Sequence, residues 1–249
     1  MADFKPIKTQ LIIFLAGFAA YLYFIDKQSA FLFTLCLSLA AASGTESLLL
    51  YFKSKKFQVT GSSLVSGLII GIVLSGDNRW WVIALAGILA ILSKHLLRFE
   101  SRHVFNPAAF GIFLSIILMA SLTEWRGAYL WYILVPFGTY FVYKIKKLKI
   151  LAGFVLTFFI LFGTQAFIRK VPIWNIFGYF NYFYLFVMLI EPKTTPSKSY
   201  GKIIFGVGAA ALIFILTDMG VKFDVELCSL LILNAFTPLL NKIPQRRRA

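Results

Sequence analysis

Residues 101–113 read SRHVFNPAAFGIF, and they interrupt a chain that is almost wholly apolar on both sides. Within six residues this stretch contains Arg102, His103, Asn106 and Pro107. Asn is favoured immediately before the first turn of a helix, and Pro is favoured at the first helical position. The stretch therefore predicts a polar turn that leads into a helix beginning at Asn106-Pro107.

Apolar side chains dominate the composition as a whole. Of the 249 residues, 59% are hydrophobic and 14% are charged, whereas about 25% are charged in a typical soluble domain. Because so little polar surface cannot cover a soluble protein of this size, we expect the lipid bilayer to cover most of it. The composition predicts an all-α integral membrane protein. It argues against nucleic-acid binding, because the net charge of +15 lies in short clusters between apolar runs.

Polar breaks divide the chain into about ten apolar runs, which we interpret as membrane spans. The runs are residues 10–25, 29–52, 61–76, 80–97, 105–122, 128–143, 150–168, 173–190, 203–217 and 225–239. With both termini inside, 19 of the 25 Lys and Arg residues fall on the inner side, including the arginines at 246–248. The remaining six are Lys27, Arg79, Arg126, Arg169, Lys170 and Lys222. This asymmetry follows the positive-inside rule and predicts a multi-pass membrane protein with cytoplasmic termini.

Ten spans divide naturally into two groups of five, residues 1–122 and 123–249, which would have opposite orientations. The run at 61–76 is short and punctuated by glycine, and short or broken spans line sites near the midplane in proteins built from inverted repeats. We therefore interpret residues 1–249 as a single membrane domain made of two inverted five-helix repeats.

The predicted helix start at Asn106 has two interpretations. A helix N-terminus offers free N–H groups and partial positive charge, so it suits an anion such as a cofactor phosphate, a lipid headgroup or a partner's carboxylates. Alternatively, it is a well-capped helix with no ligand. The first interpretation draws on the basic residues that come shortly before, which are Lys94, His95, Arg98, Arg102 and His103.

Glu46 lies about two turns inside the run 29–52, where an ionisable group is costly unless it is paired or hydrated. It is interpreted either as a way-station for a cation or a proton, or as a carboxylate that reaches an inner vestibule or a lysine. Both interpretations stay open at the level of sequence.

The stretch EPKTTP, which begins at Glu191, closes the eighth apolar run. Pro192 ends a helix, and Thr194 and Thr195 offer hydroxyls to the free carbonyl groups of its last turn. Elsewhere the chain has no Walker, HExxH, GxSxG or Rossmann motif, so we expect neither a metal site nor an autonomous catalytic site.

Three blocks, in order along the chain, resemble the NqrB/RnfD family. These proteins are the membrane flavin subunits of the sodium-pumping NADH:quinone oxidoreductase and of the Rnf ferredoxin:NAD oxidoreductase. The first block has a short polar-start helix, a Trp-opened helix ending in Lys-His, and Phe-Asn-Pro-Ala. The blocks read TGSSLVSGLIIGIVLSGDNRWWVIALAGILAILSKHLLRFESRHVFNPAAFG (60–111), FYLFVMLIEPKTTPSKSYGKIIFG (183–206) and LLILNAFTPLLNK (230–242).

The resemblance implies a ten-span inverted-repeat fold akin to that of urea channels. It also implies a flavin-bearing place in an electron-transport complex that moves Na⁺ or H⁺, beside other membrane and peripheral subunits. The candidate cofactor-binding residues are Lys94, His95, Asn106, Pro107, Thr194, Thr195 and Asn234. For the ion pathway the candidates are Glu46 and Glu191, the latter standing where the family usually has Asp.

The chain departs from the family between the fifth and sixth spans. Family members attach FMN covalently through the Thr of a Ser-Gly-Ala-Thr motif, whereas residues 121–140 read SLTEWRGAYLWYILVPFGTY. The family's Gly-Glu-Thr-Ser run is missing as well, and the chain is shorter than typical members. These departures argue against covalent FMN and leave a noncovalent flavin, riboflavin or FMN, as the expected cofactor. They also leave a second hypothesis, a small-solute or flavin transporter or channel that keeps the fold without redox chemistry.

Overall fold

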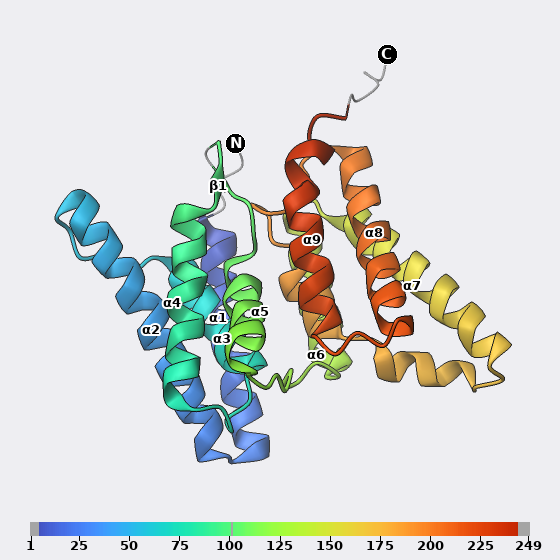
Figure 1. Cartoon of the computed structure of the whole chain (residues 1–249), viewed down its shortest axis with the longest axis horizontal. Helices are drawn as coiled ribbons and strands as arrows, with labels where there is room; N and C mark the ends of the chain where they lie inside the picture. The colour runs from blue at the N-terminus through green and yellow to red at the C-terminus, as the bar shows by residue number, and fades with distance from the viewer. Residues whose placement is uncertain (1–4, 101, 244–249) are drawn as a thin grey trace. The chain divides into compact units, whose positions relative to one another are not determined.

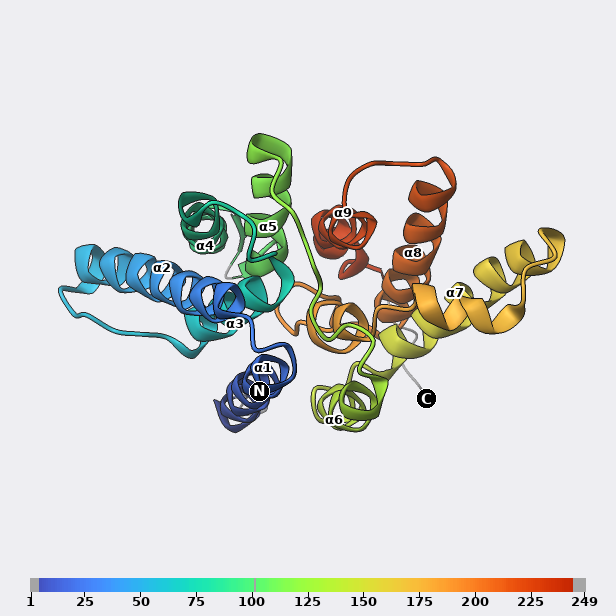
Figure 2. The ribbon, with the colours of Figure 1, turned by 90° about the horizontal axis from the view of Figure 1, so that it is seen from below.

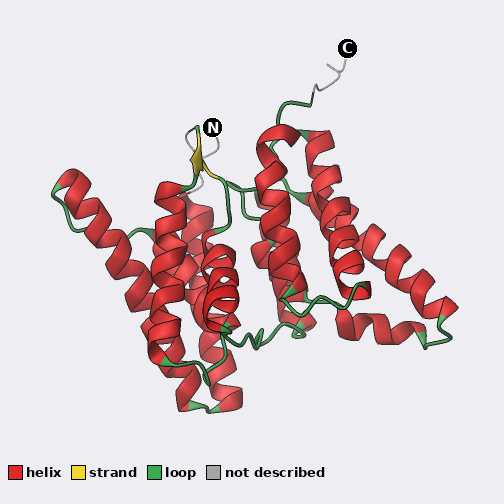
Figure 3. Ribbon diagram, viewed as in Figure 1, coloured by secondary structure: helices red, strands yellow, loops and turns green. Residues whose placement is uncertain are grey.

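A computed structural model of the chain describes residues 5–100 and 102–243. Ser101 and the arginines at 246–248, which the sequence analysis placed on the inner side, lie outside the described residues. Nearly all the regular secondary structure in the described part is helical (Figure 3). The elements, in chain order (Figure 1), are α1 (Lys5–Asp26), α2 (Ser29–Ser54), α3 (Gly61–Val73), α4 (Trp80–Leu96), β1 (Arg98–Phe99), β2 (Arg102–His103), α5 (Pro107–Met119), α6 (Trp131–Lys144), α7 (Leu148–Ile168), a 3₁₀-helix η1 (Ile173–Tyr179), a π-helix η2 (Tyr184–Met188), α8 (Ser199–Asp218) and α9 (Val225–Leu240).

The chain divides into two compact units, each of which is described by itself. Unit 1 comprises Met1–Arg98 and Pro107–Gly127, and therefore contains α1 to α5. Unit 2 comprises Phe99–Asn106 and Ala128–Ala249, and therefore contains α6 to α9 with η1 and η2. The division of a single membrane domain into repeats at residues 122 and 123 stays a prediction.

The helices have the length and composition of membrane spans. Four of those in the described chain, Ile7–Asp26, α2, α7 and α8, are long and apolar enough to cross a bilayer, and several shorter apolar helices accompany them. Their outward faces are apolar as well, since Phe24, Leu156 and Ile160 are all more than half exposed. Apolar surface of this kind needs lipid rather than water beside it. The prediction of an all-α, multi-pass membrane protein is therefore confirmed.

Small residues bring the helices of unit 1 close together. In unit 1, α2 packs against α3 and α4, and α4 packs against α5 (Figure 2). A Cβ atom added at Gly67 or Gly71 of α3 would lie 2.8 Å from the Cα atom of Leu39 or Leu35 of α2. Only glycine permits so close a backbone approach, which is a common way for helices to associate in lipid.

Two loops of unit 1 pair with each other at the end of α3. Leu74 and Thr123 form an isolated antiparallel bridge, and the side chain of Asn78 hydrogen-bonds both the N–H and the C=O of Leu122 at 2.8 Å. Arg126 of the second loop is buried: its guanidinium contacts Glu124 Oε2 at 2.5 Å and lies over the Phe31 ring. Ion pairing and packing thus hold Arg126, one of the six basic residues that the sequence analysis assigned to the outer side, inside unit 1.

Unit 2 is built around α8, which packs against α7 and α9 (Figure 2). Its glycines work in the same way as those of unit 1. A Cβ atom at Gly206 of α8 would come well inside van der Waals distance of the carbonyl oxygen of Ile150 in α7. Phe158, Phe183, Phe205 and the other large side chains of the core are almost completely buried.

The eighth predicted span, residues 173–190, is not one continuous helix. The structure has η1, a break at Phe180 and then η2, in which the N–H of Leu189 donates to the carbonyl of Tyr184 five residues earlier. The break has a local cause, because the Asn181 side chain accepts a hydrogen bond from the N–H of Tyr184 and starts a new helical turn. The other nine predicted runs each overlap an α-helix of the described chain.

Candidate functional site

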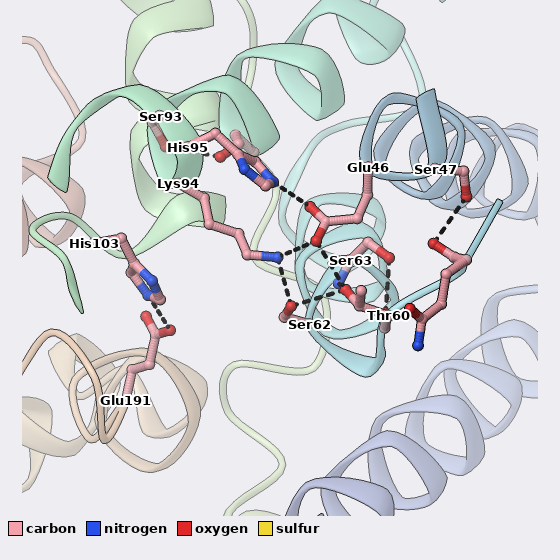
Figure 4. Close-up of polar contacts among 12 residues, drawn as sticks. Glu46, Ser47, Thr60, Ser62, Ser63, Ser93, Lys94, His95, His103 and Glu191 are labelled. Atoms are coloured by element: carbon pink, nitrogen blue, oxygen red, sulfur yellow. Dashed lines mark hydrogen bonds and ion pairs between the residues drawn. The ribbon is translucent and has the colours of Figure 1, made fainter. Parts of the chain in front are cut away.

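Unit 1 contains a compact cluster around the buried carboxylate of Glu46, which we call the Glu46 cluster (Figure 4). Glu46 Oε1 lies 2.6 Å from Lys94 Nζ and accepts a hydrogen bond from Thr60 Oγ1 at 3.2 Å. Its second oxygen, Oε2, lies 3.0 Å from His95 Nε2. Lys94 Nζ also donates to Ser62 Oγ at 2.7 Å. Both oxygens of the carboxylate are thus engaged, and one of the two sequence interpretations, a carboxylate that reaches a lysine, describes the geometry.

Three helices bring the Glu46 cluster together. Glu46 is on the face of α2 that packs against α3 and α4. Thr60 is the N-cap of α3, where its hydroxyl accepts from the N–H of Ser63. Lys94 and His95 occupy the last turn of α4, a position that favours cations because the carbonyl end of a helix carries partial negative charge. The two basic groups therefore stand where the end of α4 stabilises them, and Glu46 is stabilised by these groups from the neighbouring helix.

A second polar network lies in unit 2 and joins segments far apart in sequence. Asn234 of α9 is fully buried; its Oδ1 accepts from the N–H of Asn106 at 2.8 Å, and its Nδ2 donates to the carbonyl of Thr194 at 3.2 Å. Thr237 donates to that same carbonyl at 2.8 Å. Asn106 Nδ2 in turn donates to the carbonyl of Met188 at 3.3 Å. The network ties together the segment before α5, the end of η2 and the middle of α9.

Next to this network His103 Nε2 lies 3.1 Å from Glu191 Oε1 (Figure 4). Thr194 Oγ1 donates to the other carboxylate oxygen at 3.3 Å, and Thr195 Oγ1 donates to the backbone carbonyl of Glu191 at 2.6 Å. The two threonines thus hold the turn that follows η2. We call residues 191–196 the Glu191 turn.

The Glu191 turn rests on a buried lysine. Lys147, the residue before α7, is 4% exposed, and its Nζ donates to the carbonyl oxygens of Thr195 at 3.3 Å and Pro196 at 2.7 Å. Burial, helped by the positive charges of Lys202 and Arg102, lowers the pKa of Lys147 to about 7. An amine that is neutral near pH 7 can still donate both hydrogen bonds, so the contact does not require charge.

A cavity of about 360 Å³ opens beside the Glu191 turn, wholly within unit 2. We call it the basic cavity. Its polar wall contains Thr194, Asn234 and Thr237. The volume is at the lower end for small-molecule sites, and the side chains suit an anionic or hydroxyl-rich group. Its charged lining residues are Glu100, Arg102, His103, Lys193 and Lys242.

The residues proposed from the sequence fall into two groups, one in each unit. Lys94 and His95, expected beside a cofactor, join Glu46 in unit 1. Asn106, Thr194, Thr195 and Asn234 meet in unit 2, with Glu191 beside them, while Pro107 is the buried first residue of α5 in unit 1.

Sequence reasoning missed four residues that complete these sites: Thr60, Ser62, Lys147 and Thr237. The cap position of Thr60 before a short helix was a usable signal, because Thr is a preferred N-cap residue. For Lys147 nothing in a basic loop distinguishes the buried lysine from its exposed neighbours.

The loop between α5 and α6, residues 120–130, is held by backbone pairing with the segment around Leu74. Its one threonine, Thr123, lies in the backbone bridge to Leu74. The N–H of Ser75 donates to the carbonyl of Leu122, and the N–H of Glu124 donates to the carbonyl of Val73. The residues of the basic cavity fit the hydroxyl- and phosphate-bearing end of a flavin, because they combine cations with amide and hydroxyl groups.

Comparison with known proteins agrees with the resemblance found in the sequence. The model of the NQR2, RnfD, RnfE family matches residues 3–131 and 127–249. The D subunit of an ion-translocating oxidoreductase complex from Aeromonas hydrophila subsp. hydrophila is 28% identical over 116 residues, a match that covers 45% of this chain and 33% of the relative. The matched part of the chain thus spans about a third of the length of that curated relative. Because the family model matches both halves of the chain, the protein belongs to the NQR2, RnfD, RnfE family.

Proposed function

We propose that the chain is a membrane subunit of an ion-translocating electron-transport complex of the RnfD or NqrB type. The observation that carries the proposal is the match of the family model over nearly the whole chain. The subunit would lie in a prokaryotic inner membrane with both termini in the cytoplasm, work with other membrane and peripheral subunits, and couple electron flow to the movement of Na⁺ or H⁺. It would have no autonomous enzymatic activity.

Matching contacts in the two units support an inverted repeat of five elements each. In unit 1, α4 packs against α2 and α5; in unit 2, α8 packs against α7 and α9. The middle of each set is short: α3 has 13 residues, and the corresponding place in unit 2 is taken by η1 with seven residues and η2 with five. In proteins built from inverted repeats, such interrupted elements line the site. The Glu46 cluster lies beside α3 and the basic cavity lies beside the turn after η2, as this scheme requires.

The proposed cofactor is a noncovalent flavin, which would supply one-electron or hydride chemistry when bound. Arg102, Lys193 and Lys242 would hold a phosphate, and Asn234 with Thr237 would bound the pocket on its buried side. Glu191 and His103, which pair with each other, would balance the charge of this wall.

The visible spectrum of the protein, co-expressed with the products of neighbouring genes and purified in detergent, tests the cofactor. We expect a yellow protein whose flavin is released by acid without proteolysis. A double variant, Arg102→Gln with Lys242→Gln, should lose most of its FMN. The matched control, Lys146→Gln with Lys149→Gln, removes two exposed lysines of the same unit outside the basic cavity and should keep it. A colourless wild-type protein would contradict the redox proposal.

The second candidate function is transport of a small solute or of flavin itself. It is favoured by the missing attachment motif, because a transporter needs no fixed flavin. Uptake of riboflavin into proteoliposomes by a colourless protein would support it. A yellow protein without uptake would support electron transfer.

Glu46 is the proposed ion-pathway residue of the complex. Substitution Glu46→Gln keeps the size of the side chain and removes its charge, so we expect ion uptake by membrane vesicles to be lost while the protein stays assembled. The control is Asp26→Asn, which changes an exposed carboxylate at the end of α1, outside both the Glu46 cluster and the basic cavity. Normal ion uptake by Glu46→Gln would remove this residue from the pathway.

A further inference from the structure

In the Glu46 cluster, the ammonium group of Lys94 lies where an ion pathway would need to bind a cation. Lys94 Nζ lies 2.6 Å from Glu46 Oε1 and 2.7 Å from Ser62 Oγ, and Ser62 Oγ lies 3.0 Å from Thr60 Oγ1 (Figure 4). Carboxylate and hydroxyl oxygens are also the ligands that a hard metal cation takes. The ammonium of Lys94 thus occupies the place that a sodium ion would take.

The second carboxylate oxygen offers no alternative place. Glu46 Oε2 is 3.0 Å from His95 Nε2, and the carboxylate side chain is 2% exposed. A sodium ion at Oε2 would have to displace the imidazole and stand beside an ammonium with little water to screen the repulsion. In a buried setting such like-charge contacts are costly.

Of the three ionisable side chains in the cluster, His95 is the most exposed. Its side chain is 25% exposed, against 12% for Lys94 and 2% for Glu46. Because an ionised carboxylate only accepts hydrogen bonds, the neutral imidazole carries its proton on Nε2 and presents the lone pair of Nδ1. A proton taken from water by Nδ1 converts the imidazole to imidazolium, no bond to Glu46 breaks, and the charge of the three side chains rises from zero to +1.

Few other charges face this cluster. The helices that carry the cluster, α2, α3 and α4, pack against one another and against α1 and α5, and α5 has no charged residue. On α1 the Lys8 side chain lies against Gly61, the first residue of α3, and α3 itself has no charged residue. At the nearby ends of α2 and α4, Lys53 and Arg98 are exposed to solvent. Glu46 is therefore the single carboxylate among these named groups, and its charge is balanced by the protein's own cations.

We infer that the Glu46 cluster is a proton site from which the tethered ammonium of Lys94 excludes sodium. The inference rests on the proposed ion-translocating function, since it names the ion that this part of the pathway handles. His95 takes and returns the proton, Glu46 is the fixed counter-ion, and Lys94 fills the metal position.

The test measures the thermal midpoint (Tm) of the purified full chain in NaCl and in choline chloride at equal ionic strength. Wild-type protein should show no difference between the salts. Lys94→Met, which empties the cation position and leaves Glu46, should gain a sodium-specific rise in Tm of about 2–4 °C. The double variant Lys94→Met with Glu46→Gln should lose that rise. Sodium-specific stabilisation of the wild type that Glu46→Gln abolishes would overturn the inference, as would a folded Lys94→Met variant without any gain.

A second measurement follows the proton. The pH profile of Tm between pH 5.5 and pH 8 should differ between the wild type and His95→Gln, while both proteins keep the change that the buried Lys147 contributes. Identical pH profiles for wild type and His95→Gln would also overturn the inference. These outcomes are independent of the cofactor: a colourless protein would contradict the proposed redox function and leave the sodium and pH results intact.

Discussion

Lys147 shows how burial, with nearby positive charges, can make a basic residue sensitive to pH. Its pKa is lowered to about 7, whereas in the unfolded chain the amine keeps its proton into the ordinary alkaline range of lysine. Below pH 7 the folded protein bears the full cost of the buried charge. Above pH 7 that cost declines, because the folded state releases the proton while the unfolded state still binds it. Stability from this group therefore rises with pH between about 7 and 10.

Substitution Lys147→Met tests this at the residue scale. At pH 9 the variant should be less stable by about 1–3 kcal/mol, because the carbonyls of Thr195 and Pro196 lose their donor. At pH 7 the deficit should be smaller by about 1 kcal/mol or more. Chemical unfolding in detergent at several pH values measures the difference, with Lys149→Met, an exposed neighbour, as the control. Parallel pH curves for wild type and Lys147→Met would contradict the assignment.

Asn234 is the residue on which the polar network of unit 2 depends. Asn234→Leu fills a similar volume but removes the acceptor for the Asn106 N–H and a donor to the Thr194 carbonyl. We expect a loss of about 1–3 kcal/mol in unfolding free energy, since the site is fully buried. Asn241→Ala breaks hydrogen bonds to Ser197 where water can replace them, and should cost clearly less. Equal losses in the two variants would mean that the network adds little.

At the scale of the element, the close helix contacts at glycine residues can be tested directly by substitution. An added Cβ at Gly111 of α5 would overlap the carbonyl oxygen of Ala86 in α4, and at Gly206 of α8 that of Ile150 in α7. Gly111→Ala and Gly206→Ala should each lower stability by about 1–3 kcal/mol, because the helix pair must move apart.

Gly44 of α2 supplies the matched control for these substitutions, since a Cβ there would meet nothing within 4 Å. Gly44→Ala should be neutral or stabilise α2 by up to about 1 kcal/mol, because alanine has the higher helix propensity. The thermal midpoints of Gly111→Ala, Gly206→Ala and Gly44→Ala test whether the helix contacts cause the loss of stability. A Gly44→Ala variant as unstable as the other two would show that helix contacts are not the cause.

The elements also show what could be read from sequence. Most helices could be predicted because an apolar run between polar breaks has one stable conformation in lipid, where each backbone group must be bonded within its own segment. The run at 173–190 does not form one continuous helix, and the reason is local. The side chain of Asn181 accepts a hydrogen bond from the backbone N–H of Tyr184, which competes with helical pairing.

The spatial arrangement of neither site could be predicted, because side chains that meet in the fold but lie far apart in the sequence leave no periodic signal. Glu46 is 48 residues from Lys94 and 49 from His95. The burial of Arg126 has no signal in the sequence for a related reason, since this loop residue is buried by tertiary contacts with Glu124 and Phe31. Chemistry-bearing residue types were visible in the sequence, whereas their grouping required the fold.

At the scale of the whole molecule, the distribution of basic residues predicts which loops face the cytoplasm, and this can be tested. In a Cys36→Ser, Cys228→Ser background, single cysteines at Lys27 and Lys222 should react with a membrane-impermeant maleimide applied to intact cells. Cysteines at Lys55 and Lys149 should react only after the cells are opened. Labelling of all four positions from one side would contradict the ten-span alternation, and the reverse pattern would contradict cytoplasmic termini.

The segment Phe99–Asn106 belongs to unit 2 although the chain on either side of it belongs to unit 1. Its hydrogen bond from Asn106 to Asn234 closes a loop of 128 residues. During synthesis this segment leaves the ribosome long before its partner in α9, so unit 2 cannot complete its network until the last helix has been made. Closing so long a loop is entropically expensive and comes late in folding. A chain truncated before residue 234 would therefore insert its earlier helices but lack the hydrogen-bond partner of Asn106. The segment Phe99–Asn106 would then be accessible to quality-control proteases. Assembly of unit 2 is thus complete only when the final helix is present.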